Sequence, residues 1–368
     1  MAVDAAMRSV SQLTSNGTGL MVVDSQSRVV RHIDGQTVIR TIAGNSSNGN
    51  TGDGNLANYA TFGATGGAAV DANGNTYVSD TNFHRIRRIA PDGKIFHFAG
   101  ATNGASGSGG DNGAASAARF NRPTSLAVDV QNNLLYVSDG GNNRIRVINL
   151  TTNIITNYAG TGGAGFNNDG VIATNASLNN PAGITLDAAG NLFIADRNNQ
   201  RIRRVDAVSK LMSTVAGDGA QGFGGDGGTA TSAQLNLPAD VAVDGAGNVY
   251  IADLANHRVR RVKTNGTIET IAGNGTAGFT GDGGAATSAQ LNSPASLEMD
   301  ADCSIFVGDS NNLRVRKLTP SSTGGTSNRN PVITSTIGNQ TMIKGQTLTL
   351  PLAATDEDND MITFTLVN

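Results

Sequence analysis

The chain has 368 residues, of which 48 are Gly, and aromatic residues make up only 4% of it. Because an interior Gly costs a helix about 1 kcal/mol relative to Ala, this composition disfavours a helical protein and favours strands joined by tight turns. The net charge of -3 comes from both signs spread along the chain, which argues against a nucleic-acid partner. The single Cys303 excludes a disulfide framework and a cysteine-based zinc site. No apolar run approaches the length of a membrane span, so we expect no membrane insertion.

A strand that ends in Asp recurs along the chain and defines a repeat of about 57 residues. In chain order the strand-end residues are Asp24, Asp80, Asp139, Asp196, Asp253 and Asp309. In the last five repeats another strand ends nine or ten residues earlier, at Asp71, Asp129, Asp187, Asp244 and Asp300. Such short spacing predicts a hairpin with a tight turn. A basic third strand (258–262 in the fifth repeat) and a fourth strand (268–273) complete each unit.

Four short antiparallel strands cannot bury both faces of their own sheet, but radially stacked sheets cover one another. The repeat therefore predicts an all-β fold, a six-bladed β-propeller of four-stranded antiparallel blades. Only five fourth strands are recognisable. Residues 332–337 could complete the sixth blade, or a segment upstream of Met1 could close the ring, and we favour the upstream segment.

The first residues carry no basic or apolar signal-peptide region. We interpret Ala2-Val3-Asp4 as the end of a repeat strand, so the chain is expected to begin inside a repeat and to be a fragment of a longer protein. On this interpretation Asp4 and Asp24 are joined by a longer hairpin than their counterparts in the other repeats.

Three blocks, at residues 252–262, 273–279 and 281–284, carry a family resemblance. They resemble NHL-repeat propellers, in the long-loop form similar to that of teneurins and of bacterial secreted or surface proteins. The resemblance covers about residues 1–318 and implies a propeller that binds partners. It is not specific for one function, because one fold supports many activities.

The remaining chain differs in composition. We expect a propeller at 1–319, a Ser-, Thr-, Gly- and Asn-rich linker at 320–330, and the start of a further domain at 331–368. The last segment resembles a cadherin-like or Ig-like domain and is too short for a complete β-sandwich, which needs about 100 residues. Asp356, Asp358 and Asp360 alternate along it and share one face, like cadherin-like calcium ligands. Such a site is incomplete here, because calcium takes six to eight oxygens.

A loop Asp also recurs, at Asp53, Asp111, Asp169, Asp226 and Asp282. A carboxylate among glycines could bind Ca²⁺, but a residue that every blade repeats is expected to serve the blade. The arginines of the third strands are expected to pair across strands with the strand-end Asp, as Arg258 with Asp253, rather than to bind anions. His84 and His257 occupy one repeat position in blades that face each other across the ring, so they cannot share a metal.

The innermost strands differ in sequence between repeats, and these differences point to candidate site residues. Small residues alternate there with larger apolar ones, and Asp240 and Glu298 break this pattern in adjacent blades. We expect the two carboxylates to face the channel mouth, one strand step apart, as a blade-specific site for a cation or a basic ligand. The alternative is a pair of isolated, solvated carboxylates.

No catalytic constellation is recognisable, so the leading interpretation is a non-catalytic binding or scaffold module. Its partner would be a protein or a carbohydrate on one face of a secreted or cell-surface, adhesin-like protein. It requires no cofactor, although Ca²⁺ is possible. One alternative is a calcium-dependent hydrolase or lyase with a central site, which would show Glu, Asn and Asp converging from several inner strands. Another is a purely architectural spacer. The oligomeric state is not predicted.

Overall fold

The computed structural model describes residues 7–35, 38–300, 304–319, 332–333 and 354–355. The chain separates into two compact units, Met1–Leu318 and Thr319–Asn368. In the second unit the described residues are two short strands, β26 (Val332–Ile333) and β27 (Ala354–Thr355), which pair with each other. The predicted linker at 320–330 and the residues Asp356, Asp358 and Asp360 lie outside the described residues, as do Asp4 and Cys303.

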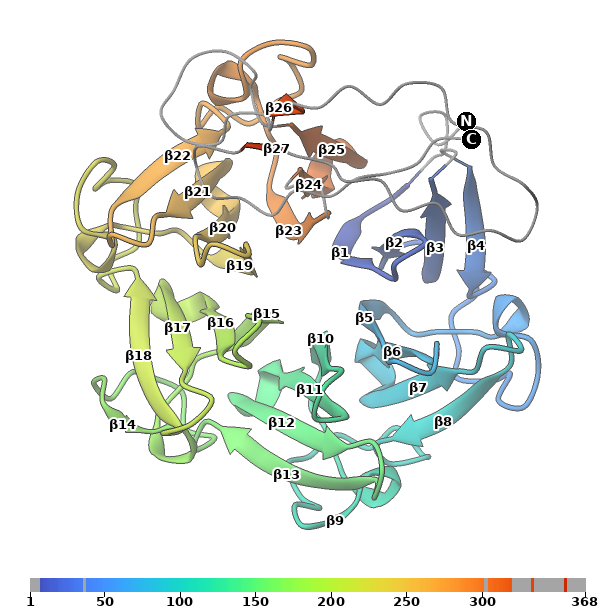
Figure 1. Ribbon diagram of the computed structural model, residues 1–368. Coiled ribbons are helices and arrows are strands. Elements are labelled where there is room, and N and C mark those ends of the chain that lie inside the picture. Colours follow the sequence, from blue (N-terminus) through green and yellow to red (C-terminus); the bar gives the residue numbers. More distant parts are fainter. Residues whose placement is uncertain (1–6, 36–37, 301–303, 320–331, 334–353, 356–368) are drawn as a thin grey trace. The chain divides into compact units, whose positions relative to one another are not determined.

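The first unit consists of six antiparallel sheets arranged as blades around a central axis (Figure 1). Blade 1 contains β1 (Val10–Ser15), β2 (Gly19–Asp24), β3 (Val29–Asp34) and β4 (Ile39–Ala43). Blade 2 contains β5 (Thr65–Val70), β6 (Thr76–Asp80), β7 (Arg85–Ile89) and β8 (Ile95–Ala99). Blade 3 contains β10 (Pro123–Asp129), β11 (Leu134–Asp139), β12 (Arg144–Asn149) and β13 (Ile154–Ala159).

The other three blades follow in chain order. Blade 4 contains β15 (Pro181–Leu186), β16 (Leu192–Asp196), β17 (Arg201–Val205) and β18 (Leu211–Ala216). Blade 5 contains β19 (Pro238–Val243), β20 (Val249–Asp253), β21 (Arg258–Val262) and β22 (Ile268–Ala272). Blade 6 contains β23 (Pro294–Met299), β24 (Ile305–Asp309) and β25 (Arg314–Leu318).

Short 3-10 helices occupy two repeated positions between the strands. One set precedes the first strand of a blade: η2 (Ala57–Tyr59), η4 (Ala115–Ala117), η6 (Ala173–Asn175), η8 (Ala230–Ser232) and η10 (Ala286–Ser288). The other set follows the second strand: η3 (Thr81–Phe83), η5 (Gly140–Asn142), η7 (Arg197–Asn199), η9 (Leu254–Asn256) and η11 (Ser310–Asn312).

The ring is closed, since the innermost strands contact one another in sequence and β1 packs against both β23 and β24. The apolar core is therefore divided among the interfaces between neighbouring blades. Between blades 2 and 3, for example, Ile86 and Ala99 pack with Leu126 and Val137. Alanines of the first set of 3-10 helices, such as Ala115, are buried in these interfaces. The predicted six-bladed all-β propeller is thus confirmed, while the predicted C-terminal β-sandwich is not shown.

Three details differ from the sequence-based expectations. The first hairpin is as short as the others, because β1 pairs with β2 through Ser15 and Leu20, so the inference of a long hairpin from Asp4 was wrong. Blades 3 and 4 have a fifth strand, because the loop segments β9 (Gly113–Ala114) and β14 (Val171–Ile172) add to the outer edges of those sheets. The sixth blade has three strands among the described residues, and β26 of the second unit pairs with β27.

The long loops between blades are held by a buried arginine. In blade 5 the Asp226 carboxylate accepts bonds from Arg260 Nε at 3.1 Å and Nη2 at 2.6 Å. The same guanidinium lies 3.7 Å from the carboxylate of the strand-end Asp253. Four other blades repeat the contact through the pairs Asp53–Arg87, Asp111–Arg146, Asp169–Arg203 and Asp282–Arg316. The expected ion pair between Asp253 and Arg258 is not formed: Arg258 lies on the same strand face as Arg260 but stacks on Phe223, and Arg260 lies between the two carboxylates. In blade 2 the equivalent expected pair does form, between Arg85 Nε and Asp80 at 3.5 Å.

A second repeated contact joins each blade to the next. His84 has left-handed backbone geometry (φ 54°), and its Nδ1 accepts a bond from the N–H of Arg122 at 3.0 Å. His257 does the same for Ser293 at 3.1 Å. In the blades between them Asn143 and Gln200 take this position and accept bonds from the N–H groups of Asn180 and Leu237. Each of the two histidines therefore links its blade to the next by a hydrogen bond, and we call them the histidine staples.

The first prediction concerns the buried ion pairs. We expect Asp226→Ala to lower the free energy of unfolding by about 3 kcal/mol, because it removes the hydrogen-bonded carboxylate of the fully buried Arg260 and leaves only that of Asp253, at 3.7 Å. Denaturant unfolding would measure the loss. Asp282→Ala is the matched control: its carboxylate is 65% exposed, so its loss should be about 1 kcal/mol or less. Equal losses in the two variants would contradict the assigned role of burial.

The second prediction concerns the histidine staples. Burial lowers the pKa of His84 and His257. A group whose pKa is lower in the folded state contributes stability that is present above about pH 6.5 and is lost as the pH falls. We expect the variant His84→Asn/His257→Asn, which keeps an acceptor as at Asn143, to lose less stability than the wild type between about pH 7 and pH 5. Urea titrations at several pH values would measure this, and identical pH profiles would refute it.

Candidate functional site

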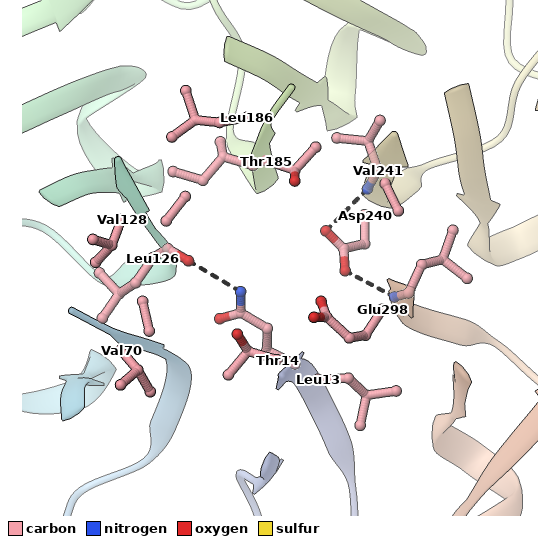
Figure 2. A pocket seen from close by; sticks show the side chains of 16 residues that line it. Leu13, Thr14, Val70, Leu126, Val128, Thr185, Leu186, Asp240, Val241 and Glu298 are labelled. Atoms are coloured by element: carbon pink, nitrogen blue, oxygen red, sulfur yellow. Dashed lines mark hydrogen bonds between the residues drawn. The ribbon is translucent and has the colours of Figure 1, made fainter. Parts of the chain in front are cut away.

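The inner strands of all six blades enclose a cavity of ≈ 200 Å³ on the axis. Many of the residues around it are apolar, such as Leu13, Val70 and Leu186 (Figure 2), but the surface that its wall exposes is mostly polar. The two carboxylates in this wall belong to Asp240 on β19 and Glu298 on β23, which lie close together and point into the cavity. The structure therefore brings together the two acidic residues that the sequence singled out.

Asp240 is only 5% exposed, and both of its oxygens accept backbone bonds. Oδ1 accepts from the N–H of Val241 and Oδ2 from that of Leu297 in the next blade, each at 2.9 Å. Gly183 makes room for it, since a Cβ at that position would lie 1.9 Å from Oδ1. Burial raises the pKa of Asp240 to about 7, although the two N–H groups oppose this shift. Asp240 thus also holds blade 5 against blade 6.

Glu298 completes the pair from the neighbouring blade. Its Oε1 accepts the N–H of Ser15 at 2.7 Å, which links blade 6 to blade 1 across the point where the ring closes. Burial, together with the nearby charge of Asp240, raises the pKa of Glu298 to about 8, although the N–H of Ser15 opposes this shift. Near neutral pH the pair therefore retains protons, and a bound cation would displace them.

The side chain of Gln12 forms a polar plug at one end of this cavity. Gln12 reaches from β1 across the axis, and its Nε2 donates to Ser125 Oγ at 3.1 Å and to the Leu126 carbonyl at 3.3 Å. Its Oε1 accepts the N–H of Ala68 at 3.0 Å. A Cβ at Gly67 would lie 2.0 Å from that oxygen, so glycine is needed there. One side chain thus connects blades 1, 2 and 3.

A second cavity, of ≈ 320 Å³, lies at the starts of the inner strands and shares Gln12 and Asp240 with the first. Its wall carries many Ser and Thr hydroxyls and the side chain of Arg197. The sequence analysis did not single out Arg197. The signal was present, because the residue after the strand-end Asp is uncharged in every blade except the fourth. In chain order these residues are Ser25, Thr81, Gly140, Arg197, Leu254 and Ser310.

The other candidate residues lie elsewhere. The five loop Asp residues bind the buried arginines and line neither cavity. Within the described ranges no three His, Cys, Asp or Glu side chains are grouped as a metal site would need. The same part of the chain contains no helix that is long and apolar enough to cross a membrane. The first cavity therefore offers a pair of carboxylates that could hold one cation, and the second offers the guanidinium of Arg197.

A third prediction follows from the axial carboxyls. Folding raises their pKa values above the usual value near 4, so the native state keeps protons that the unfolded chain releases. Their contribution to stability is present below about pH 4 and is lost as the pH rises toward 8. We expect Asp240→Asn/Glu298→Gln to flatten this decline in denaturant titrations, while the exposed Asp92→Asn should not. A decline unchanged in the double variant would show that the two carboxyls ionise freely.

Comparison with known proteins places the chain in a family. A family model described as the teneurin NHL domain matches residues 16–149 and 212–278, more than half of the chain, and an NHL repeat model matches residues 178–205. The protein SUPPRESSOR OF QUENCHING 1, chloroplastic, of Arabidopsis thaliana is 28% identical over 270 residues, covering 70% of this chain and 25% of that protein. Teneurin-1 of Mus musculus is 29% identical over 245 residues, covering 58% of this chain and 8% of teneurin-1. The chain thus spans a quarter or less of these two relatives.

Solved structures share the fold at low identity. An auxiliary nutrient binding protein from Bacteroides ovatus ATCC 8483 superposes with a TM-score of 0.61 at 17% identity, covering 86% of this chain and 70% of that chain. A virginiamycin B lyase from Staphylococcus aureus superposes with a TM-score of 0.51 at 17% identity, covering 85% of this chain and 80% of that chain. These likenesses show the architecture alone, which a binding protein and a lyase have in common. The match to the family model shows more: the chain belongs to the teneurin NHL domain family.

Proposed function

We propose that this propeller is a non-catalytic, protein-binding module of a larger secreted or cell-surface protein. The observation that carries the proposal is a row of three half-exposed phenylalanines at one repeat position in adjacent blades. Phe166, Phe223 and Phe279 are 38%, 43% and 39% exposed. Because the blades repeat around the axis, the three rings lie on the same side of the molecule at successive blades.

Each of these rings is held in place before any partner arrives. Phe223 stacks on the guanidinium of Arg258 at 3.7 Å, and the carbonyl of the preceding Gly222 accepts a bond from Asn256 Nδ2 at 2.7 Å. The same loop is fixed by Asp226 through the buried Arg260. Phe166 and Phe279 stack in the same way on Arg201 and Arg314, at 3.9 and 3.7 Å. The loops therefore have little conformational entropy left to lose on binding.

Blades 2 and 3 are built differently at this point. There the arginines Arg87 and Arg146 stack on the fully buried Phe62 and Phe120, at 5.0 and 5.7 Å. In the later blades Leu235 and its repeat counterparts occupy the buried position, and the phenylalanine is on the outside. The exposed row is thus confined to one side of the ring, as a docking surface for one partner would be. Rigid aromatic and arginine side chains are typical anchors of protein interfaces.

The absence of catalysis is part of the proposal. A calcium-dependent lyase or hydrolase would need six to eight oxygens around its ion. The axial cavity offers two carboxylates, and both oxygens of Asp240 already accept backbone N–H groups. These acids are better suited to a single basic group of a partner, which would enter the channel mouth.

The fourth prediction tests the docking row. We expect the triple variant Phe166→Ala/Phe223→Ala/Phe279→Ala to lose proteins that the immobilised wild-type propeller retains, and to weaken binding of a purified partner by at least about tenfold in calorimetry. Tyr59→Ala/Val130→Ala removes apolar groups that are 66% and 54% exposed on blades without the row, and should bind normally.

The triple variant must also remain folded with one cooperative melting transition, because the three lost cation–π pairs together contribute about 1.5–3 kcal/mol. Equal loss of binding in both variants would show that the interaction is nonspecific, and unchanged binding in the triple variant would place the partner elsewhere.

A further inference from the structure

Arg197 is a cation without a counter-ion at the second mouth of the axial channel. It is the first residue of η7 and lines the ≈ 320 Å³ cavity. The neighbouring Asp196 faces away from the cavity: its Oδ2 accepts a bond from Asn199 at 2.7 Å and lies 3.5 Å from Arg203. Within the part of the chain that the structure describes, the Arg197 guanidinium makes no hydrogen bond or ion pair.

Burial acts on this guanidinium and lowers its pKa, with no carboxylate near enough to oppose the shift. A partly desolvated cation is costly unless a partner compensates it. In the other five blades the equivalent residue is Ser, Thr, Gly or Leu, so the blade itself does not require a charge here. The departure from the repeat therefore indicates a ligand rather than a structural role.

The rest of the wall restricts what that ligand can be. The hydroxyl of Thr81 donates to the Pro123 carbonyl at 2.8 Å, and that of Ser11 donates to the Val23 carbonyl at 3.1 Å. A hydroxyl that donates its proton in this way keeps its lone pairs, so it presents an acceptor to anything in the cavity. A complementary ligand must supply several hydrogen-bond donors as well as one negative charge.

We propose that this mouth binds a small, polyhydroxylated carboxylate of the hexuronate type. The carboxylate pairs with the guanidinium of Arg197, the planar donor that suits it, and the ligand hydroxyls donate to the Ser and Thr oxygens. The volume of the cavity is at the lower end of the range for ligand sites, which fits one sugar ring better than a chain of them. Sulfate has no hydrogen-bond donor and phosphate has at most two, so neither can satisfy several hydroxyl acceptors in addition to Arg197.

The test uses the full chain and D-glucuronate as the probe, with binding measured by calorimetry or by ligand-observed NMR. We expect glucuronate to bind measurably, and D-glucose and acetate to bind at least about tenfold more weakly, since each lacks half of the recognised chemistry. Methyl β-D-glucuronide separates a free sugar acid from the end of a chain: equal binding indicates a terminal residue of a glycan, and loss of binding a free acid.

Arg197→Leu, which installs the residue found at position 254, should reduce glucuronate binding at least about tenfold while leaving the melting temperature and the phenylalanine-dependent partner binding unchanged. Arg122→Leu is the control, because Arg122 is an exposed cation at the same rim. The proposal is overturned if the wild type does not bind glucuronate, if Arg197→Leu binds it normally, or if acetate or inorganic phosphate binds equally well.

Discussion

A buried guanidinium, held between two carboxylates, is the interaction on which the long loops of this propeller depend. Arg87, Arg146, Arg203 and Arg260 are completely buried, and each is compensated by a loop Asp and, in three cases, by the strand-end Asp of its own blade. Burying a cation is expensive, so the native loop conformation is the one that supplies the missing charge. The loop in turn inserts its 3-10 helix alanines between blades and completes the apolar core.

Residues that repeat from blade to blade and residues that differ between blades have different roles. Positions that are alike in every blade, such as the strand-end and loop Asp, build the ring. Positions that differ between blades lie on the axis or on the surface: Asp240, Glu298 and Arg197 each change in one blade and lie on the axis, and the three outer phenylalanines lie on the loops of adjacent blades. The two axial cavities differ in chemistry: the first has the carboxylates of Asp240 and Glu298 in its wall, whereas the second is lined by Asp240 together with Arg122 and Arg197, and Gln12 borders both.

Gln12 and Asp240 are the large side chains at a level of the axis where the other blades carry Gly or Ser, and the glycines at 67 and 183 face them. Four blades are thereby connected through polar contacts on the axis, since Ser125 Oγ also accepts the N–H of Ile184. Fully satisfied buried networks of this kind favour one arrangement of the packed parts over its alternatives.

The sequence alone was sufficient to predict the number of blades, the four-stranded pairing of blades 2 to 5 and the two acids on the axis, because period-two alternation and a 57-residue repeat are local patterns. It did not determine which Asp each Arg would meet. Arg260 and Asp226 are 34 residues apart, and only the course of the loop over the next blade brings them together. The sequence marked Arg197 as a departure from the repeat, but it did not show the cavity, because the hydroxyls around Arg197 come from other blades. Local periodicity encodes elements, whereas charge compensation and cavities arise only after distant elements have packed.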